Sequence, residues 1–195
     1  MLQVHTLTLG LYQTNCYLVH KEDSKDCIVI DPGSEADTIM NRAALLGLEI
    51  QAILLTHGHF DHVGAVKSLA ATISCPVYIR PEEYTLPAFL NKGLHSTDYY
   101  PANGQLSVAG MDILVLHTPG HTPGSVCLMA EDKLFTGDTL FAGSCGRIDF
   151  PGGSGADMLS SLRRLKDLPG DFCVYPGHGG STTLDRERHA NPYLL

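Results

Sequence analysis

Short apolar runs and alternating apolar and polar positions dominate the chain, and both patterns predict β-strands. Val4, Thr6 and Thr8, for example, alternate with Leu7 and Leu9. The predicted strands are residues 4–9, 27–30, 50–55, 111–117, 126–130, 134–136 and 173–175. Helical segments fall between them, so we expect a mixed α/β (α+β) chain in which helices cover sheets.

Three segments place apolar residues at helical spacing. The first starts with Ser34 and Asp37, which have the spacing of a capping box, and stops at Gly47. The second is expected over residues 63–70. The third begins at a capping Ser154 and presents four apolar residues on one face, Met158, Leu159, Leu162 and Leu165.

Residues 81–104 break this regular pattern. They are polar, contain three prolines and show no clear period. Because apolar strands resume on both sides, we expect a surface excursion within one domain, residues 1–195, and not a linker between two domains.

The composition narrows the class of protein. The chain has 195 residues, of which 44% are apolar, and this is enough to bury a core. A net charge of −8 argues against nucleic acid as the partner. The first residues lack the basic and apolar regions typical of a signal peptide, so none is expected. No apolar run approaches the roughly 18 residues of a membrane helix, so no membrane partner is expected. The six cysteines form no Cys-x-x-Cys pair, which favours free thiols in a cytoplasmic protein.

The strongest chemical signal follows the predicted strand 50–55. His57 and His59 are two residues apart in an extended segment, so both side chains can reach the same metal ion. Asp61 and His62 lie where the chain turns into the next helix and can face a second ion. Imidazole and carboxylate groups suit zinc, iron or manganese without any thiolate.

Three further strands end in a turn that contains glycine and carries a His or an Asp. These residues are His121, Asp138 and His178. Glycine lets the backbone turn sharply, so side chains at several strand ends can converge on one edge of a sheet. Together with the first motif, they supply five His and two Asp as candidate ligands.

These segments resemble the metallo-β-lactamase superfamily, and most closely its glyoxalase II (hydroxyacylglutathione hydrolase) members; they are residues 56–62, 119–121, 137–138 and 176–178. The resemblance extends over nearly the whole chain and implies a four-layer αββα sandwich with metals at its edge. It implies a first metal on His57, His59 and His121, a second on Asp61, His62 and His178, and Asp138 between both.

The chemistry implied is hydrolysis by two divalent ions, zinc in the first place, with iron or manganese as alternatives. Two ions roughly 3.5–4 Å apart lower the pKa of a shared water and give a hydroxide near neutral pH. With Asp61 and Asp138 beside it, this hydroxide would attack a carbonyl whose oxyanion a metal stabilises. A thioester suits the arrangement because a thiolate is a good leaving group.

At several positions this sequence differs from other members of the superfamily, and these differences argue against their activities. Class B β-lactamases carry Cys where Asp138 stands, which disfavours β-lactam hydrolysis, and flavodiiron proteins carry Glu at the position of His59. RNA-processing members have additional domains. A small-molecule thioester such as S-lactoylglutathione remains, although the C-terminal helical domain that supplies much of the glutathione site in glyoxalase II is expected to be missing.

Residues 143–150 resemble the substrate-side loop of the family. Arg147 could hold a substrate carboxylate through two hydrogen bonds, beside Cys145 and Gly146, and a solvated Arg fits the sequence equally well. Asp31 and Thr56 are candidates for orienting a ligand histidine, since metal-bound imidazoles usually need a hydrogen-bond partner.

Two alternatives remain open. Residues 146–150 also resemble persulfide dioxygenases, which use a single iron; His57, His121 and Asp138 would then be the ligands. The other alternative is a metal-bound interaction module without turnover, against which the complete ligand set speaks. The metal, the acyl group and the oligomeric state are left open by the sequence.

Overall fold

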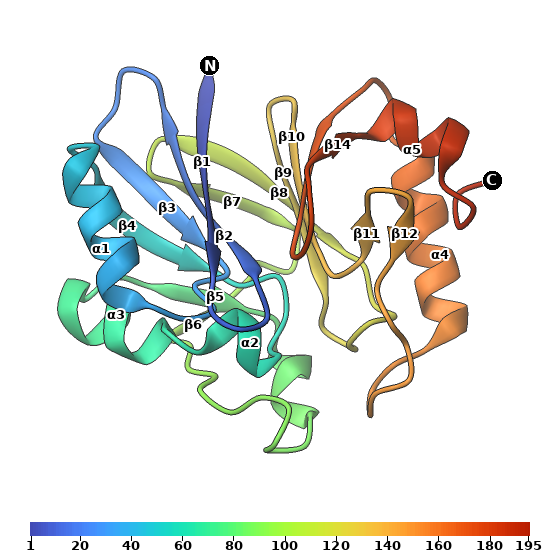
Figure 1. Cartoon of the computed structure of the whole chain (residues 1–195), viewed down its shortest axis with the longest axis horizontal. Helices are drawn as coiled ribbons and strands as arrows, with labels where there is room; N and C mark the ends of the chain where they lie inside the picture. The colour runs from blue at the N-terminus through green and yellow to red at the C-terminus, as the bar shows by residue number, and fades with distance from the viewer.

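Two six-stranded sheets lie face to face in the computed structural model, which describes residues 1–195 (Figure 1). The first, in spatial order, contains β1 (Leu2–Leu9), β2 (Thr14–Lys21), β3 (Asp26–Ile30), β4 (Glu49–Leu54), β5 (Val77–Ile79) and β6 (Asp98–Tyr99). The second contains β14 (Thr182–Thr183), β13 (Cys173–Pro176), β10 (Lys133–Gly137), β9 (Val126–Ala130), β8 (Met111–His117) and β7 (Gln105–Val108). A small ribbon of β11 (Leu140–Phe141) and β12 (Ser144–Cys145) follows β10.

Helices cover the outer side of each sheet. The helices on the first sheet are α1 (Ala36–Leu45) and α3 (Val66–Ile73), and those on the second are α4 (Gly155–Lys166) and α5 (Leu184–Ala190). A single turn, α2 (Phe60–Val63), and a 3-10 helix, η1 (Pro81–Thr85), complete the set. The expected αββα sandwich is confirmed.

The core consists of three apolar clusters, one between each pair of adjacent layers of the four-layer fold. Ile39 and Val66 pack helices α1 and α3 onto the first sheet. Leu54 and Phe135, from opposite sheets, belong to the cluster between the sheets. Leu162 packs α4 onto the second sheet. Because each cluster is fully buried, the strands are held firmly and their ends form a rigid rim.

The directions of β4, β10 and β13 determine where the predicted ligands lie. β4 is parallel to β3 and β5, and β10 is parallel to β13. Segments that leave the carboxyl ends of parallel strands emerge at the same edge of their sheet. The segments after β4, β10 and β13 are the ones that carry the predicted ligands, and they lead to one rim of the sandwich (Figure 1).

The predicted strands are present, but several others were not predicted. The clearest case is β2, whose residues Thr14–Val19 are all buried. A strand buried on both faces shows no alternation of apolar and polar residues, and here two polar residues, Thr14 and Asn15, begin the strand and shorten its apolar run. Short edge strands such as β6 and β14, with two residues each, carry too little pattern to be recognised.

The helix predicted over residues 63–70 is divided into α2 and α3. The Ala65 N–H donates to the carbonyl of Pro32, 3.0 Å away, and not to a carbonyl of the preceding turn. A Cβ on Gly64 would lie only 2.3 Å from the carbonyl oxygen of Gly33. The close approach of residues 32–33 therefore replaces the helical hydrogen bond and splits the helix.

The capping box predicted at Ser34 is wrong. The residue before α1 is Glu35, which has a left-handed backbone (φ 56°) and makes no side-chain cap, while Ser34 Oγ is buried without a partner. The C-terminal prediction is confirmed, because Gly47 has φ 69° and donates to the carbonyl of Ala44. Ser154 caps α4 as predicted, accepting from the N–H of Asp157, although Leu159 is exposed.

Residues 81–104 are not only a surface excursion. Leu86, Leu90 and Tyr100 are buried, and the side chain of Glu83 is fully buried. The Phe60 N–H donates to the carbonyl of Leu90 at 2.7 Å, which ties the segment to the start of α2. The segment thus packs against the rim that carries the predicted ligands.

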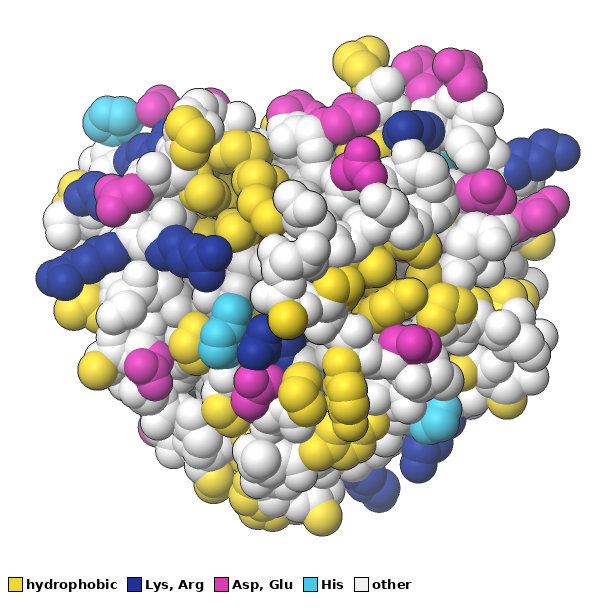
Figure 2. Space-filling model, turned by 180° about the vertical axis from the view of Figure 1, so that it is seen from behind, with side chains coloured by type: hydrophobic (Ala, Val, Ile, Leu, Met, Phe, Trp, Pro, Cys, Tyr) yellow, Lys and Arg dark blue, Asp and Glu magenta, His cyan; other side chains and the backbone are white.

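Charged side chains of both signs are mixed with apolar ones on the back of the molecule (Figure 2). No broad basic area gathers on this face, in keeping with the net charge of −8. The structure contains no helix with the length and apolar character needed to cross a membrane.

Candidate metal centre

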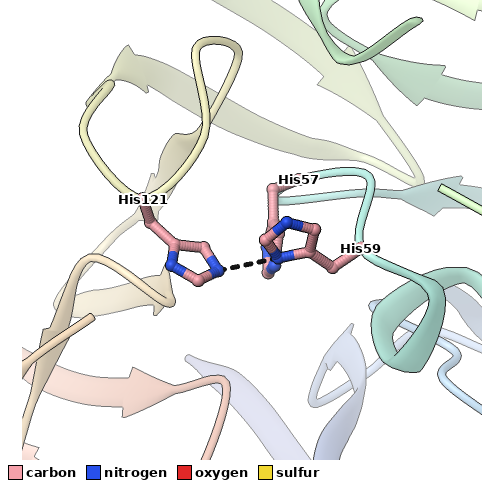
Figure 3. Close-up of side chains that lie close together, drawn as sticks. All are labelled: His57, His59 and His121. Carbon is pink, nitrogen blue, oxygen red and sulfur yellow. Dashed lines mark hydrogen bonds between the residues drawn. The ribbon is translucent and has the colours of Figure 1, made fainter. Parts of the chain in front are cut away.

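Three histidines from two loops converge at the rim (Figure 3). His57 and His59 follow β4, and His121 lies between β8 and β9. Each offers a ring nitrogen, and these atoms all lie within 4.8 Å of one another; all three residues are buried. His59 Nδ1 and His121 Nε2 are 2.8 Å apart, the contact drawn as a dashed line in Figure 3.

A second group lies beside the first. Asp61 and His62 come from α2, and His178 follows β13. Their ligand atoms also lie within 4.8 Å of one another. His178 Nε2 is 3.3 Å from both Asp61 Oδ2 and His62 Nε2.

Asp138 stands between the two groups. Its Oδ1 is 3.4 Å from His62 Nε2, in the second group, and its Oδ2 is 3.5 Å from His121 Nε2, in the first. The distance from Oδ2 to His178 Nε2 is 3.7 Å. The structure thus brings all seven candidate ligands together at one place.

The side chains present fit metal ions. Four buried side-chain atoms have no hydrogen-bond partner, and three of them belong to this cluster: His57 Nε2, His59 Nε2 and Asp138 Oδ1. Leaving a buried polar atom unpaired is costly, so such atoms call for a ligand. Imidazole nitrogens and carboxylate oxygens, with no thiolate among them, are a donor set for divalent zinc, iron or manganese.

The three histidines of the first group have lowered pKa values, which favours their neutral, metal-binding form. Burial, followed by the neighbouring histidines, lowers the pKa of His57 well below its ordinary value and lowers that of His59 to about 4. Burial also lowers the pKa of His121. The three rings are therefore neutral at pH 7, which is the form that binds a metal.

In the second group the pKa values of the side chains favour their charged forms. Burial lowers the pKa of His62, but the carboxylate of Asp138 and those of Asp31 and Asp61 outweigh it and raise the pKa to about 9. Burial acts against ionisation of Asp61, but the hydrogen bond from His178 and the charges of His62 and His178 together outweigh it and lower its pKa below the ordinary value. The metal-free second group therefore carries a proton that a bound cation would displace.

Asp31 and Thr56, the candidates for orienting a ligand histidine, both contact candidate ligands. Asp31 Oδ2 is 3.0 Å from His62 Nδ1, and the Thr56 hydroxyl donates to the same oxygen at 2.6 Å. Thr56 Oγ1 is in turn 3.1 Å from His57 Nδ1. One buried carboxylate thus reaches a histidine of each group, directly in one case and through a hydroxyl in the other.

Backbone carbonyls orient two more histidines, and no sequence motif marks these carbonyls. His121 Nδ1 is 2.8 Å from the carbonyl oxygen of Arg147. His178 Nδ1 is 3.2 Å from that of Tyr12, in the loop between β1 and β2. Any residue type supplies a carbonyl, so a sequence motif cannot reveal such partners.

A cleft of about 650 Å³ opens onto the cluster and carries aromatic side chains around it. His59 and Phe150 are in edge-to-face contact, as are His178 and Phe141. The other large apolar residues of the lining are Tyr12, Phe60, Phe89 and Leu90. These residues could not be predicted from the sequence, because isolated aromatics in loops form no pattern.

The three predicted substrate contacts have different surroundings. The guanidinium of Arg147 forms two hydrogen bonds to Asp149, of 2.7 and 2.6 Å, and lies 3.8 Å from the centre of the Phe150 ring. The Nε and Nη2 donors of Arg147 are therefore already bound to the Asp149 carboxylate. Cys145 lines the cleft, and burial raises its thiol pKa.

Gly146 does not line the cleft on the metal side. A Cβ at this position would lie 1.8 Å from the carbonyl oxygen of Asp138. The glycine thus permits close packing of the substrate-side loop against the residue between the two ligand groups.

Known proteins with this fold were identified by sequence and by structure. The family model of the metallo-β-lactamase superfamily matches residues 9–178. The hydroxyacylglutathione hydrolase GloC of Haemophilus influenzae is 35% identical over 209 residues, an alignment that includes 99% of this chain and 98% of GloC.

Two crystal structures superpose closely. The B3 metallo-β-lactamase BLEG-1 has a TM-score of 0.90 at 34% identity, with both chains fully covered. TTHA1623, in a di-iron-bound form, has a TM-score of 0.84 at 38% identity, covering 98% of this chain and all of TTHA1623. The protein described here belongs to the metallo-β-lactamase superfamily.

Proposed function

We propose that the protein is a two-metal hydrolase that cleaves thioesters of small molecules, with S-lactoylglutathione as the first substrate to test. The observation that carries this proposal is the pair of three-residue ligand groups with Asp138 between them. The di-iron form of TTHA1623 and the name of GloC support the number of metals and the substrate class, respectively.

In this proposal His57, His59 and His121 hold one divalent ion, and Asp61, His62 and His178 hold the other. Such a pair, when bound, lowers the pKa of a water molecule and polarises a carbonyl oxygen. Zinc suits the nitrogen-rich first group, and iron suits the same donors, so both are candidates.

The chain's own residues have three tasks. Asp138 Oδ1, buried and without a partner, can accept a hydrogen bond from the attacking water and direct its lone pair. Asp61, which is ionised at neutral pH, does the same from the side of the second group. The aromatic side chains of the cleft exclude water around the substrate carbonyl, which strengthens these polar contacts.

The leaving group needs little from the protein. A thiolate departs without prior protonation, so no general acid is required beside the cleft. Cys145 does not serve as a nucleophile in this scheme, because burial raises the pKa of its thiol and keeps it protonated at pH 7.

The decisive experiment combines metal analysis with turnover. Purified protein loaded with zinc or iron is expected to hold two ions per chain and to hydrolyse S-lactoylglutathione, with Asp138→Ala folded and inactive. Full loading with no turnover of any thioester in a panel of acyl groups would refute the proposed activity. One iron per chain, with oxygen-dependent sulfite formation from glutathione persulfide, would identify a persulfide dioxygenase instead.

A second candidate is β-lactam hydrolysis, which the sequence analysis disfavoured. The reason to test it is the similarity to BLEG-1, a B3 metallo-β-lactamase, at 34% identity over the whole chain. A chromogenic cephalosporin, assayed with the same metal-loaded preparation, separates the two activities by their kcat/KM values.

A further inference from the structure

Glu83 is a fully buried carboxylate that the mechanism described above does not use. It lies in η1, within the segment expected to be a surface excursion, and its exposed fraction is 0%. No Lys or Arg forms an ion pair with it, so its negative charge is satisfied in some other way.

Both oxygens of Glu83 accept hydrogen bonds from backbone amides. Glu83 Oε2 accepts from the Gly58 N–H at 2.6 Å, and Oε1 accepts from the Gly124 N–H at 2.7 Å. Amide bonds to a carboxylate are charge-assisted and stronger than neutral ones. The side chain thus joins two loops with its two oxygens.

The two loops are those that carry the first ligand group. Gly58 stands between His57 and His59, and Gly124 lies three residues after His121. In the sequence, Glu83 is 25 residues from the first loop and 41 from the second. It therefore fixes the separation of two segments whose histidines must meet at the same point.

The glycines make this contact possible. A Cβ on Gly58 would lie 2.9 Å from Glu83 Oε2, and one on Gly124 would lie 2.7 Å from Oε1 and 2.9 Å from Cγ. Such contacts are too short for real side chains, so any larger residue would push the carboxylate away. The two glycines and the carboxylate form one matched unit.

The segment that carries Glu83 is itself anchored. Asn91 Nδ2 donates to the carbonyls of Glu83 and Leu86, at 3.4 and 3.3 Å, and the Leu90 carbonyl accepts from Phe60 N–H. Leu86 and Leu90 are buried. The carboxylate is therefore a fixed point for the loops, because the residues that follow it are buried and hydrogen-bonded.

We propose that Glu83 is a positioning residue for the first metal: its carboxylate holds the His57–His59 loop and the His121 loop at the separation that metal binding requires. This inference rests on the proposed function for the identity of the ligands. It predicts that loosening Glu83 weakens the metal affinity of the first group, because ligands held by fixed partners bind more tightly than mobile ones.

Glu83→Gln tests the inference, since the amide can accept only one of the two N–H bonds and presents an NH₂ group to the other. The matched control is Glu187→Gln. Glu187 is also buried (1% exposed) and accepts from the Gly143 N–H and the Thr182 hydroxyl, but it contacts none of the ligand loops.

The readout is the dissociation constant of each zinc ion, measured by competition with a chromophoric chelator, together with the melting temperature. Both variants are expected to lower the melting temperature. Glu83→Gln is expected to raise one of the two zinc dissociation constants by about tenfold and to leave the other unchanged. A tenfold effect is typical of partners that orient metal ligands. Glu187→Gln is expected to keep both constants of the wild type.

Gly124→Ala provides a second test that leaves the carboxylate in place. If Glu83→Gln does not fold, Gly124→Ala is compared with Gly110→Ala, a position where an added Cβ meets nothing within 4 Å and where the φ of 68° lowers stability without touching the ligand loops. In the double variant Glu83→Gln/Gly124→Ala the losses of zinc affinity should be far from additive, since both changes break the same contact.

The outcomes separate the two levels of the proposal. Wild-type protein that binds no zinc would refute the metal centre itself. Wild-type protein that binds two zinc ions, with Glu83→Gln less than fivefold weaker than Glu187→Gln at both sites, would overturn the role of Glu83 alone. A loss of fivefold or more at one site, confined to the Glu83 and Gly124 variants, supports it.

Discussion

Asp31 contacts His62 through Oδ2, 3.0 Å from His62 Nδ1, although 31 residues separate the two in the sequence. The same carboxylate accepts the N–H and the hydroxyl of Thr56, at 2.7 and 2.6 Å. Asp31 has a left-handed backbone (φ 50°), which turns its side chain from the end of β3 toward the ligand histidines. A buried acceptor of this kind fixes the orientation of an imidazole ring.

Replacing Asp31 by Asn should weaken the second metal without disturbing the backbone. Asn tolerates the left-handed conformation but presents one NH₂ group where His62 Nδ1 or Thr56 needs an acceptor. We expect about tenfold weaker zinc binding at one of the two sites, measured by chelator competition. Asp112→Asn, an exposed position, is the control; equal affinities in the two variants would show that Asp31 has no orienting role.

Several features of the centre could be predicted because neighbouring residues encode them. His57, His59, Asp61 and His62 lie in one short segment, and a glycine-containing turn after an apolar strand marked Asp138 and His178. Strand direction then brings these segments together, as parallel pairing puts their carboxyl ends at one edge. The pattern of apolar residues carried the fold because it reports burial directly.

Other features depend on contacts between distant residues and left no local pattern. Glu83 appeared as one acidic residue in a polar segment, and only packing shows that both its oxygens face backbone amides. Asn15, in the unpredicted strand β2, donates to the carbonyl of Pro176, 161 residues away, and so holds the loop of His178. The wrong capping box at Ser34 has the same origin, because Glu35, whose carboxylate accepts the N–H of the distant Gly10, takes the cap position with a left-handed backbone.

The two capping predictions can be separated by stability. Ser154→Ala removes a hydroxyl that accepts the Asp157 N–H at 3.2 Å, and should lower the free energy of unfolding by about 1 kcal/mol. Ser34→Ala removes a buried hydroxyl without a partner, so it should leave stability unchanged or raise it slightly. Denaturant titration of both variants provides the check, and a larger loss for Ser34→Ala would contradict the cap assignment.

Arg147 is engaged by Asp149, and this pair should limit the binding of anionic substrates. Both side chains are more than half exposed, so the pair contributes little to stability. Asp149→Asn frees the guanidinium and should lower KM for S-lactoylglutathione by about threefold, while KM for an uncharged thioester stays the same. The double variant Arg147→Ala/Asp149→Asn should lose the gain; a gain that persists there would exclude Arg147 as its source.

Gly177 is packed against the residue between the two ligand groups, which makes it sensitive to a single methyl group. A Cβ there would lie 2.2 Å from Asp138 Oδ1 and 2.7 Å from His62 Cε1. Gly177→Ala should therefore lose bound metal and activity while the far-UV circular dichroism remains that of the wild type. Gly179→Ala is the control, because its Cβ meets nothing within 4 Å; its φ of 77° should lower stability by about 1 kcal/mol.

Removing the metal should give the protein a pH-dependent stability that His62 dominates near neutrality. Burial lowers the pKa of His62, but Asp138 and its other carboxylate neighbours raise it to about 9, above the ordinary 6.5. A pKa raised by folding means that protonation stabilises the folded state, fully below pH 6.5 and progressively less up to pH 9. Between pH 6.5 and 8 the contribution of His62 should fall by on the order of 1–2 kcal/mol. The lowered pKa values of His57, His59 and His121 act in the opposite direction and offset part of this loss.

Zinc should abolish this loss, because metal binding displaces the proton that distinguishes the two pH values. Denaturant titrations at pH 6.5 and 8, with and without chelator, measure the difference, and the window stays below the titration of the cysteine thiols. Calorimetry at pH 7 in buffers with different ionisation enthalpies should also record release of about one proton from His62 when zinc binds. Equal stability of the chelated protein at both pH values, with no proton released, would mean that His62 is neutral before the metal arrives.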